Sequence, residues 1–227
     1  MKNYFRLLQF ADTAFPVGTF SFSNGLETAA HLGVVRDAAT LKAYARSAAR
    51  QAAFTDGVAA LKSYRNARED NLAGIILADR ELILFRLNEE ARLMQTRMGK
   101  KMAELGAVLY GADSLMGKWL DSVKTGESPG SYPVAQGVAF ALEALEERDL
   151  FVAHQYGVIN MILSAALRLT RVSHYDTQKI LFELGENIES AYEEARKMEF
   201  INMNSFAPEM DIFASLHEKG KMRMFMN

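Results

Sequence analysis

Apolar positions recur at helical spacing along most of this chain. Between residues 37 and 54 they fall three or four residues apart, at Leu41, Tyr44, Ala45, Ala48 and Ala52. A longer stretch, 88–111, repeats this pattern at Leu93, Met94, Met98, Met102 and Leu105. No convincing run of Val, Ile and Thr alternates with polar residues as a strand would. The pattern therefore predicts an all-α fold, a multi-helix bundle.

Capping residues mark where several predicted helices begin. A short helix is expected over residues 25–32, and Asn24 and Glu27 have the spacing of a capping box at its start. Asp37 is the expected N-cap of the next helix. That helix either kinks or ends at residues 55–57, where Thr-Asp-Gly interrupts the pattern.

One stretch rich in Ser, Gly and Pro interrupts the helical pattern. Residues 121–132 are typical of a flexible loop. The segments on both sides of it look alike, and its length is ordinary for a surface loop. We therefore expect a single all-α domain over residues 1–227, with a second flexible stretch in the C-terminal tail, 219–227.

The longest apolar stretch covers residues 150–169. Its length would let a helix cross a bilayer. However, His154, Gln155, Asn160 and Arg168 interrupt it, and polar groups inside a membrane are costly. The sequence thus favours the buried central helix of a soluble bundle, in which His154 is a hydrogen-bonded core residue.

Composition excludes several classes of site and partner. Hydrophobic residues make up 49% of the chain, which is enough for a sizeable core. The formal net charge of −2 gives no reason to expect nucleic acid or a membrane as a partner. The absence of cysteine excludes disulfides, thiolate metal sites and Cys nucleophiles. Because the N-terminus is also a poor signal peptide, we expect a cytoplasmic protein.

Residues 10–30 differ from the helical remainder because they combine four Phe with three helix breakers, Pro16, Gly18 and Gly25. Ser23 lacks the Gly-x-Ser-x-Gly context of a nucleophile elbow. The glycine spacing is not that of a phosphate-binding loop. An extended backbone here would place Phe20 and Phe22 on one side of the segment. Both rings then either pack on the protein's own core or face a partner.

No arrangement of His or carboxylates selects a catalytic or metal site. The four His residues are scattered, and no pair has the i, i+4 spacing of a zinc-binding helix. A weak or shared metal site at His217 stays open. Paired Glu residues lie beside Lys or Arg, as on a solvated helix face. We expect no enzyme activity, no catalytic residue and no tightly bound cofactor.

Four stretches of this chain follow one family's pattern in order and spacing. The first matches at Leu7, Leu8, Gln9, Pro16, Gly18, Phe20, Ser23, Gly25, Leu26 and Glu27. An Arg-x-Met-Gly element lies at Arg97, Met98 and Gly99, and a Pro-Val element opens the small-residue helix at Pro133. The ending matches at Phe206, Ala207, Pro208, Asp211, His217, Glu218, Arg223 and Phe225. Taken together, these stretches resemble the urease accessory protein F family over essentially the whole chain.

This resemblance has three departures. The family's usual Arg-Leu-Phe ending with a terminal Ser is Arg223-Met-Phe225-Met-Asn here. Thr19 stands where the family often has a second glycine. Gln178 lies in "SHYDTQ" and lacks the glycine of the family's Gly-Gln element, which puts its role in doubt.

The resemblance implies an all-α homodimer that acts as an adaptor. It would link a D/H-type urease accessory protein to the GTPase accessory protein G, and it would assist GTP-dependent nickel insertion into apo-urease. Nickel would be handled by the complex, and a role in regulating the GTPase follows from the same resemblance. The implied partner-binding residues are Pro16, Gly18, Phe20, Ser23, Gly25, Leu26, Glu27, Arg97, Gln178, His217, Arg223 and Phe225.

Two alternatives come from other functional classes. A helical enzyme would need a polar cavity with a perturbed ionisable group. A helical DNA-binding regulator would need a basic recognition helix, for which residues 92–101 are the nearest approach.

Overall fold

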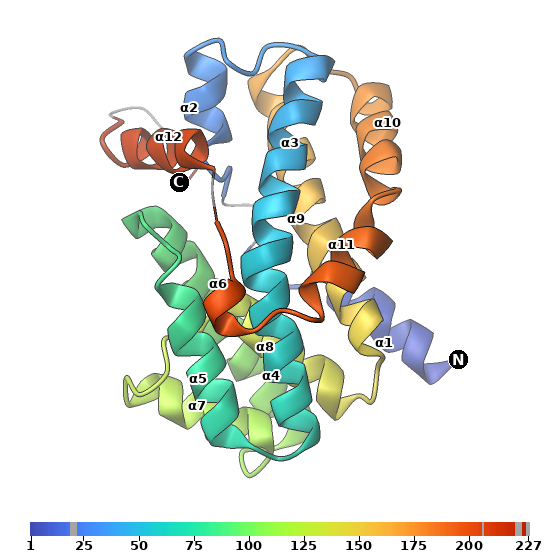
Figure 1. The fold of residues 1–227 in the computed structure, drawn as a ribbon, viewed down its shortest axis with the longest axis vertical. Helices are drawn as coiled ribbons and strands as arrows, with labels where there is room; N and C mark the ends of the chain where they lie inside the picture. The colour runs from blue at the N-terminus through green and yellow to red at the C-terminus, as the bar shows by residue number, and fades with distance from the viewer. Residues whose placement is uncertain (19–21, 206, 221–223, 226–227) are drawn as a thin grey trace.

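The computed structural model describes residues 1–18, 22–205, 207–220 and 224–225, and none of these residues forms a β-strand. The first part of the chain contains α1 (Lys2–Ala11), α2 (Leu26–His31), α3 (Ala38–Ala52), η2 (Ala53–Gly57), α4 (Val58–Arg68), α5 (Leu72–Ile83) and α6 (Glu89–Tyr110). The second part contains α7 (Leu115–Lys124), α8 (Tyr132–Leu142), α9 (Glu147–Leu169), α10 (His174–Gly185), α11 (Ile188–Ala195), η3 (Phe200–Asn202) and α12 (Pro208–Glu218). The predicted all-α fold is confirmed (Figure 1).

Helix α9 is the central element of the bundle, as the sequence predicts. It packs against α3 along its length and also contacts α1, α2, α8, α10 and α11. By length and composition α9 could cross a membrane, but 56% of its apolar window is buried inside the protein. Burial of this extent is what a core helix shows, and one such helix is weak evidence for a membrane span.

Helices α3 and α4 form one long rod with a π-helical turn between them. Asp37 caps the rod through a capping box with Thr40, as predicted. The helix does not end at residues 55–57, because the backbone passes through the π-helical residues of η2 directly into α4. A π-helical turn inserts an extra residue into the helix, and such turns are frequent at functional sites.

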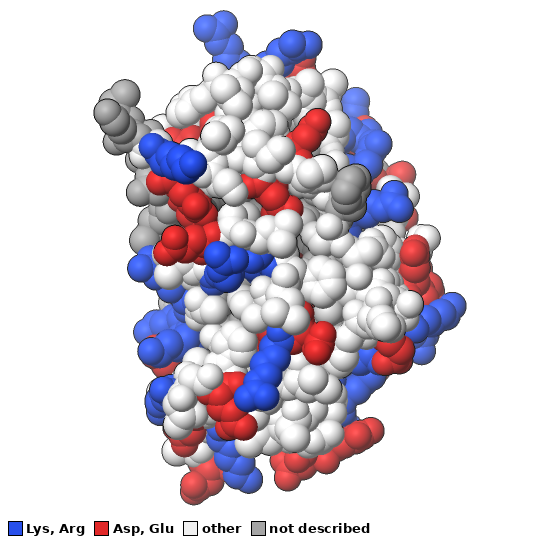
Figure 2. All heavy atoms as spheres, turned by 60° about the vertical axis from the view of Figure 1, so that its left-hand side comes forward, with Lys and Arg blue, Asp and Glu red and all other residues white. Residues whose placement is uncertain are grey.

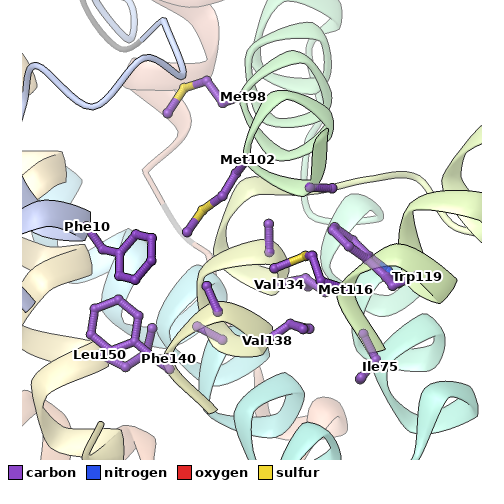
Figure 3. Packing of buried hydrophobic residues seen from close by; sticks show 14 of the residues in the cluster. Phe10, Ile75, Met98, Met102, Met116, Trp119, Val134, Val138, Phe140 and Leu150 are labelled. Carbon is purple, nitrogen blue, oxygen red and sulfur yellow. The ribbon is translucent and has the colours of Figure 1, made fainter. Parts of the chain in front are cut away.

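The larger core cluster joins α1 to the α4–α8 layer (Figure 3). Trp119 and Phe140 are fully buried there, and Met116 fills the space beside Trp119. Phe10 of α1 packs on Phe140 with 6.1 Å between ring centroids. Full burial of one such side chain contributes roughly 1.5–3 kcal/mol, so this contact holds α1 to the bundle.

The loop before α8 is shorter than the sequence predicts. The predicted boundaries of 121–132 are wrong at the start, because α7 continues to Lys124 and leaves residues 125–131 as the connection. The buried carboxylate of Asp79 accepts hydrogen bonds from Ser128 Oγ at 2.5 Å, Gly130 N at 2.6 Å and Ser131 N at 2.9 Å. Asp79 thereby supplies acceptors for backbone N–H groups that would otherwise be buried without partners.

Candidate partner-binding site

The segment that leads into α2 makes a left-handed turn beneath α12. Asn24 and Gly25 have φ angles of 52° and 78°. A Cβ on Gly25 would lie 3.0 Å from Ala214 N and 3.1 Å from Met210 O, so α12 packs directly on this backbone. The predicted capping box is therefore wrong. Gly25 is the N-cap in place of Asn24, and the first-turn amide of Glu27 donates to Ser23 Oγ at 3.5 Å.

The carboxylate of Glu27 turns away from its own helix and meets His217 of α12. His217 Nε2 lies 3.0 Å from Glu27 Oε2, and His217 Nδ1 lies 3.0 Å from Glu90 Oε2 on α6. All three side chains are buried. Both contacts are hydrogen bonds only if the ring carries a proton on each nitrogen, because a neutral imidazole has one N–H. We call this arrangement the Glu27–His217–Glu90 cluster.

The Glu27–His217–Glu90 cluster determines whether a ring nitrogen of His217 is available to bind a metal ion. Each ring nitrogen already faces a carboxylate, so neither lone pair is left for a metal ion. Among the described residues, no group of three or more His, Asp or Glu side chains is arranged to hold a metal. The geometry thus makes His217 the side chain that links α2, α6 and α12.

Glu27 also holds the described end of the chain. Its carboxylate accepts hydrogen bonds from Met224 N at 2.8 Å and Phe225 N at 3.1 Å. The Phe225 ring is buried, and the guanidinium of Arg168 lies 4.5 Å from its centroid. Such cation–π contacts contribute about 0.5–2 kcal/mol. Residues 224 and 225 of the predicted flexible tail are therefore docked on the domain.

The electrostatics of Glu27 reflect these contacts. Burial by itself would raise the pKa of its carboxyl, because it disfavours the charged form. The hydrogen bonds from the Met224 amide, the His217 ring and the Phe225 amide oppose burial and lower the pKa below its ordinary value. The ionised form is therefore the one that holds α12 and residues 224–225 in place.

The other implied partner-binding residues divide by exposure. Pro16 and Gly18 are exposed, and a Cβ on Gly18 would meet open space. Ser23 and Leu26 are fully buried. Phe22 is 4% exposed and belongs to the core, whereas Phe20 lies outside the described residues.

Arg97, Gln178 and Arg223 stand apart from the buried set. Arg97 is exposed on α6, and Gln178 is exposed on α10. Figure 1 shows α10 and α12 on opposite sides of α3, so Gln178 is well separated from the Glu27–His217–Glu90 cluster. Arg223 lies outside the described residues. The structure thus brings together the two ends of the chain but not the whole implied set.

Sequence reasoning missed a buried polar group around Asp56. Arg86 donates a short hydrogen bond to Asp56 Oδ1, and Gln95 Nε2 donates to the same oxygen at 2.9 Å. His154 Nε2 lies 4.0 Å from Asp56 Oδ2. The only hints in the sequence are the break at residues 55–57 and a histidine inside an apolar helix. Neither hint indicates that the two meet.

The face of the molecule in Figure 2 carries neither a purely basic nor a purely acidic patch. Lys and Arg are interspersed with Asp and Glu there, around a broad area without charged side chains. A nucleic-acid-binding face would carry a basic patch.

Comparisons with known proteins agree with this picture. Residues 35–185 match the family model described as UreF. The chain is 49% identical to urease accessory protein UreF 2 of Brucella canis over 97% of this chain and 90% of that protein. It is 45% identical to urease accessory protein UreF of Yersinia enterocolitica over 98% of this chain and 97% of that protein. The chain therefore belongs to the UreF family of urease accessory proteins.

Proposed function

We propose that this protein is a cytoplasmic, homodimeric adaptor. It links a D/H-type urease accessory protein to the accessory GTPase G, and it assists GTP-dependent insertion of nickel into apo-urease. Family membership over nearly the whole chain carries this proposal. Nickel is the cargo of the assembly. The adaptor provides binding surfaces and regulates the GTPase, and it catalyses no reaction itself.

Exposed apolar side chains around Gln178 support a partner surface on α10. Tyr175 is 89% exposed and Phe182 is 77% exposed. They lie seven residues apart, so they point to the same side of the helix, with Gln178 next to that line. Two large aromatic side chains exposed to solvent on the same side of one helix favour a protein-docking surface there.

A second exposed apolar set lies near the docked chain end. Ile212, Leu216 and Met224 are all exposed, and the first two are four residues apart on α12. Because α10 and α12 lie on opposite sides of α3, the two surfaces can engage different partners at once. Such separation is what an adaptor requires.

The two alternatives fare differently. The DNA-binding hypothesis is weakened, because Lys101 on the candidate recognition helix pairs with Glu104. The enzyme hypothesis required a polar cavity with a perturbed ionisable group, and the surroundings of His154 meet that description. Family membership still favours the accessory role.

Size-exclusion chromatography with the purified D/H-type protein and the accessory GTPase tests the proposal. We expect co-elution of all three components. Phe182→Ser should weaken capture of one partner, and Ile201→Ser provides the matched control, because Ile201 on η3 is also a largely exposed apolar residue. If the wild-type chain never co-elutes with either protein, the adaptor hypothesis is wrong.

A genetic test addresses the biological assignment. Deletion of the gene in a urease-positive host, with ample nickel and normal urease expression, should abolish or strongly reduce urease activity. Unchanged activity in that host would contradict the assignment to urease maturation.

A further inference from the structure

A cavity of about 100 Å³ lies between the N-terminal segment and helices α3, α6, α9 and α12. Its lining includes a polar set, Asp56, Arg86, Gln95, Gln136 and His154. Exposed Asp12 and Arg168 also line it, so the cavity reaches the protein surface. One water needs roughly 10–15 Å³ of such space, so the cavity has room for several waters.

The hydrogen bonds of His154 determine which ring nitrogen carries the proton and which one keeps a lone pair. Nδ1 lies 2.7 Å from Gln136 Oε1, and Gln136 Nε2 donates to the Tyr132 hydroxyl at 3.0 Å. Because Gln136 presents its oxygen, Nδ1 carries the proton and donates it. Burial lowers the pKa of His154 and favours the neutral ring, while the Asp56 carboxylate raises that pKa and Arg86 lowers it. Nε2 is then an acceptor, and it is buried without a hydrogen-bond partner.

One carboxylate oxygen lies near this nitrogen, and a second unpaired acceptor belongs to the same cavity lining. Asp56 Oδ1 accepts from both Arg86 and Gln95, whereas Asp56 Oδ2 lies 4.0 Å from His154 Nε2. Gln95 Oε1 is buried without a hydrogen-bond partner. The amide of Gln95 thus uses its donor on Asp56 and leaves its acceptor unpaired. Unpaired buried acceptors cost roughly 1–3 kcal/mol each, so a ligand that supplies positive charge would be stabilising here.

The geometry points to a binding site for a first-row divalent transition cation, with His154 Nε2 and Asp56 Oδ2 as protein ligands. Metal–nitrogen and metal–oxygen bonds of about 2.0–2.2 Å place two ligands of one ion at most about 4.2 Å apart. The observed 4.0 Å therefore allows both atoms to bind one ion, in a wide or nearly trans arrangement. Gln95 Oε1 and water would complete the coordination.

The surroundings of both ligand atoms match those of metal-binding side chains. A metal-bound histidine donates its other N–H to an acceptor that fixes the ring, and a metal-bound carboxylate is itself hydrogen-bonded. His154 donates to Gln136, and Asp56 accepts from Gln95 on Oδ1 and not on Oδ2, the oxygen nearest to His154. The orientation of both side chains is therefore set before any ion arrives.

Arg86 limits how tightly this site holds a cation. Its guanidinium already pairs with Asp56, and like charges repel strongly in a buried setting. The site is consequently weak and exchangeable, and it does not retain an ion through purification. This opposition gives a test with a defined sign, because removal of Arg86 should strengthen cation binding.

The inference goes beyond the adaptor role and does not depend on it. An adaptor could bring partners together without touching the ion, whereas this site means that the chain itself binds it. Loss of cation binding would leave co-elution with partners unchanged, so the two proposals fail separately.

Titration of the full-length protein with Co²⁺ and with Ni²⁺, followed by NMR of ¹⁵N-labelled imidazoles, tests the site. We expect paramagnetic broadening of His154 at ion concentrations that leave exposed His174 unaffected. His154→Gln should weaken binding at least tenfold by calorimetry, and Arg86→Gln should tighten it. His174→Gln is the matched control and should change nothing.

A further variant keeps the proposal testable if His154→Gln fails to fold. Gln95→Glu leaves His154 in place and adds a carboxylate where the unpaired oxygen lies, so it should tighten Co²⁺ binding. Broadening confined to exposed histidines would overturn the proposal. Equal affinity of wild type, His154→Gln and Gln95→Glu would also overturn it, because binding would then be on the surface.

Discussion

Replacement of Glu27 by Gln isolates the charge that joins the two ends of the chain. The substitution keeps the shape of the side chain, which is 2% exposed. It replaces one carboxylate oxygen by an NH₂ group, which is a donor. The three neighbours of that carboxylate, His217 Nε2, Met224 N and Phe225 N, are all donors. The new amide group therefore meets donors where it needs an acceptor.

The expected cost follows from these contacts. Breaking a buried ion pair by removing one partner costs about 3–5 kcal/mol. For a domain of 150–250 residues, each kcal/mol lowers Tm by about 2–4 °C. The Glu27→Gln variant should thus unfold roughly 6–20 °C below the wild type.

The chain end supplies a second and more local measure. Two charge-assisted hydrogen bonds to backbone N–H groups contribute about 1.5–3 kcal/mol each. A loss of about 1.4 kcal/mol corresponds to a tenfold change in an opening equilibrium. We therefore expect amide hydrogen exchange at Met224 and Phe225 to accelerate at least tenfold in the variant, measured below its unfolding transition.

The assay is thermal unfolding followed by circular dichroism, combined with hydrogen exchange read by mass spectrometry. Glu127→Gln is the control, because Glu127 is an exposed residue of the loop before α8. It should change stability by no more than about 0.5 kcal/mol. A Glu27→Gln variant with the Tm and exchange rates of the control would refute the ion-pairing role given to Glu27.

Three further predictions concern stability. Asp79→Asn should cost about 3 kcal/mol or more in urea unfolding, because its amide would face the donors of the loop before α8. Gly99→Ala should lower the free energy of unfolding by at least about 2 kcal/mol, because a Cβ there would lie 2.0 Å from Gly130 O. The control Gly157→Ala should be neutral or stabilising in the same assay, because a Cβ at that position has nothing within 4 Å. Burial would raise the pKa of the Glu147 carboxyl, but hydrogen bonds from Arg65 and Tyr192 lower it. The stability that this group contributes is therefore present above its unfolded pKa and is lost as pH falls. Glu147→Gln should flatten the acid side of a curve of unfolding free energy against pH, and an unchanged curve would contradict this.

Local patterns in the sequence were sufficient for the helical elements. The apolar spacing that predicts α3 and α6 depends on neighbours three and four residues away, and those neighbours are the same in the fold. The N-cap at Asp37 is local in the same sense, since its partner Thr40 is three residues on. The interruptions in α9 also point correctly to a core helix, because polar side chains in it find partners inside the protein, as His154 does with Gln136.

The errors arose where distant segments decide the outcome. Asn24 and Glu27 have the spacing of a capping box, but α12 packs on Gly25 and His217 engages the Glu27 carboxylate. That contact spans 190 residues, so no window of sequence contains it. The cavity beside His154 shows the same limit, because its polar lining comes from η2, α6 and α9 and only folding brings these residues together.

Burial changes which residues can meet a partner. Ser23, Leu26, Glu27 and His217 are all buried, so they influence a partner only through the segments that they hold in place. Gln178 is exposed on a helix with aromatic neighbours and can make contact directly. Exposed and buried residues of the implied partner-binding set can be told apart by experiment. Gln178→Ala should weaken complex formation at unchanged Tm. Glu27→Gln should lower Tm and should affect the complex only as far as residues 224–225 are released. If Glu27→Gln abolished co-elution while its Tm and exchange rates stayed at wild-type values, the carboxylate would itself be a partner contact, and the buried position described here would have to open in the complex.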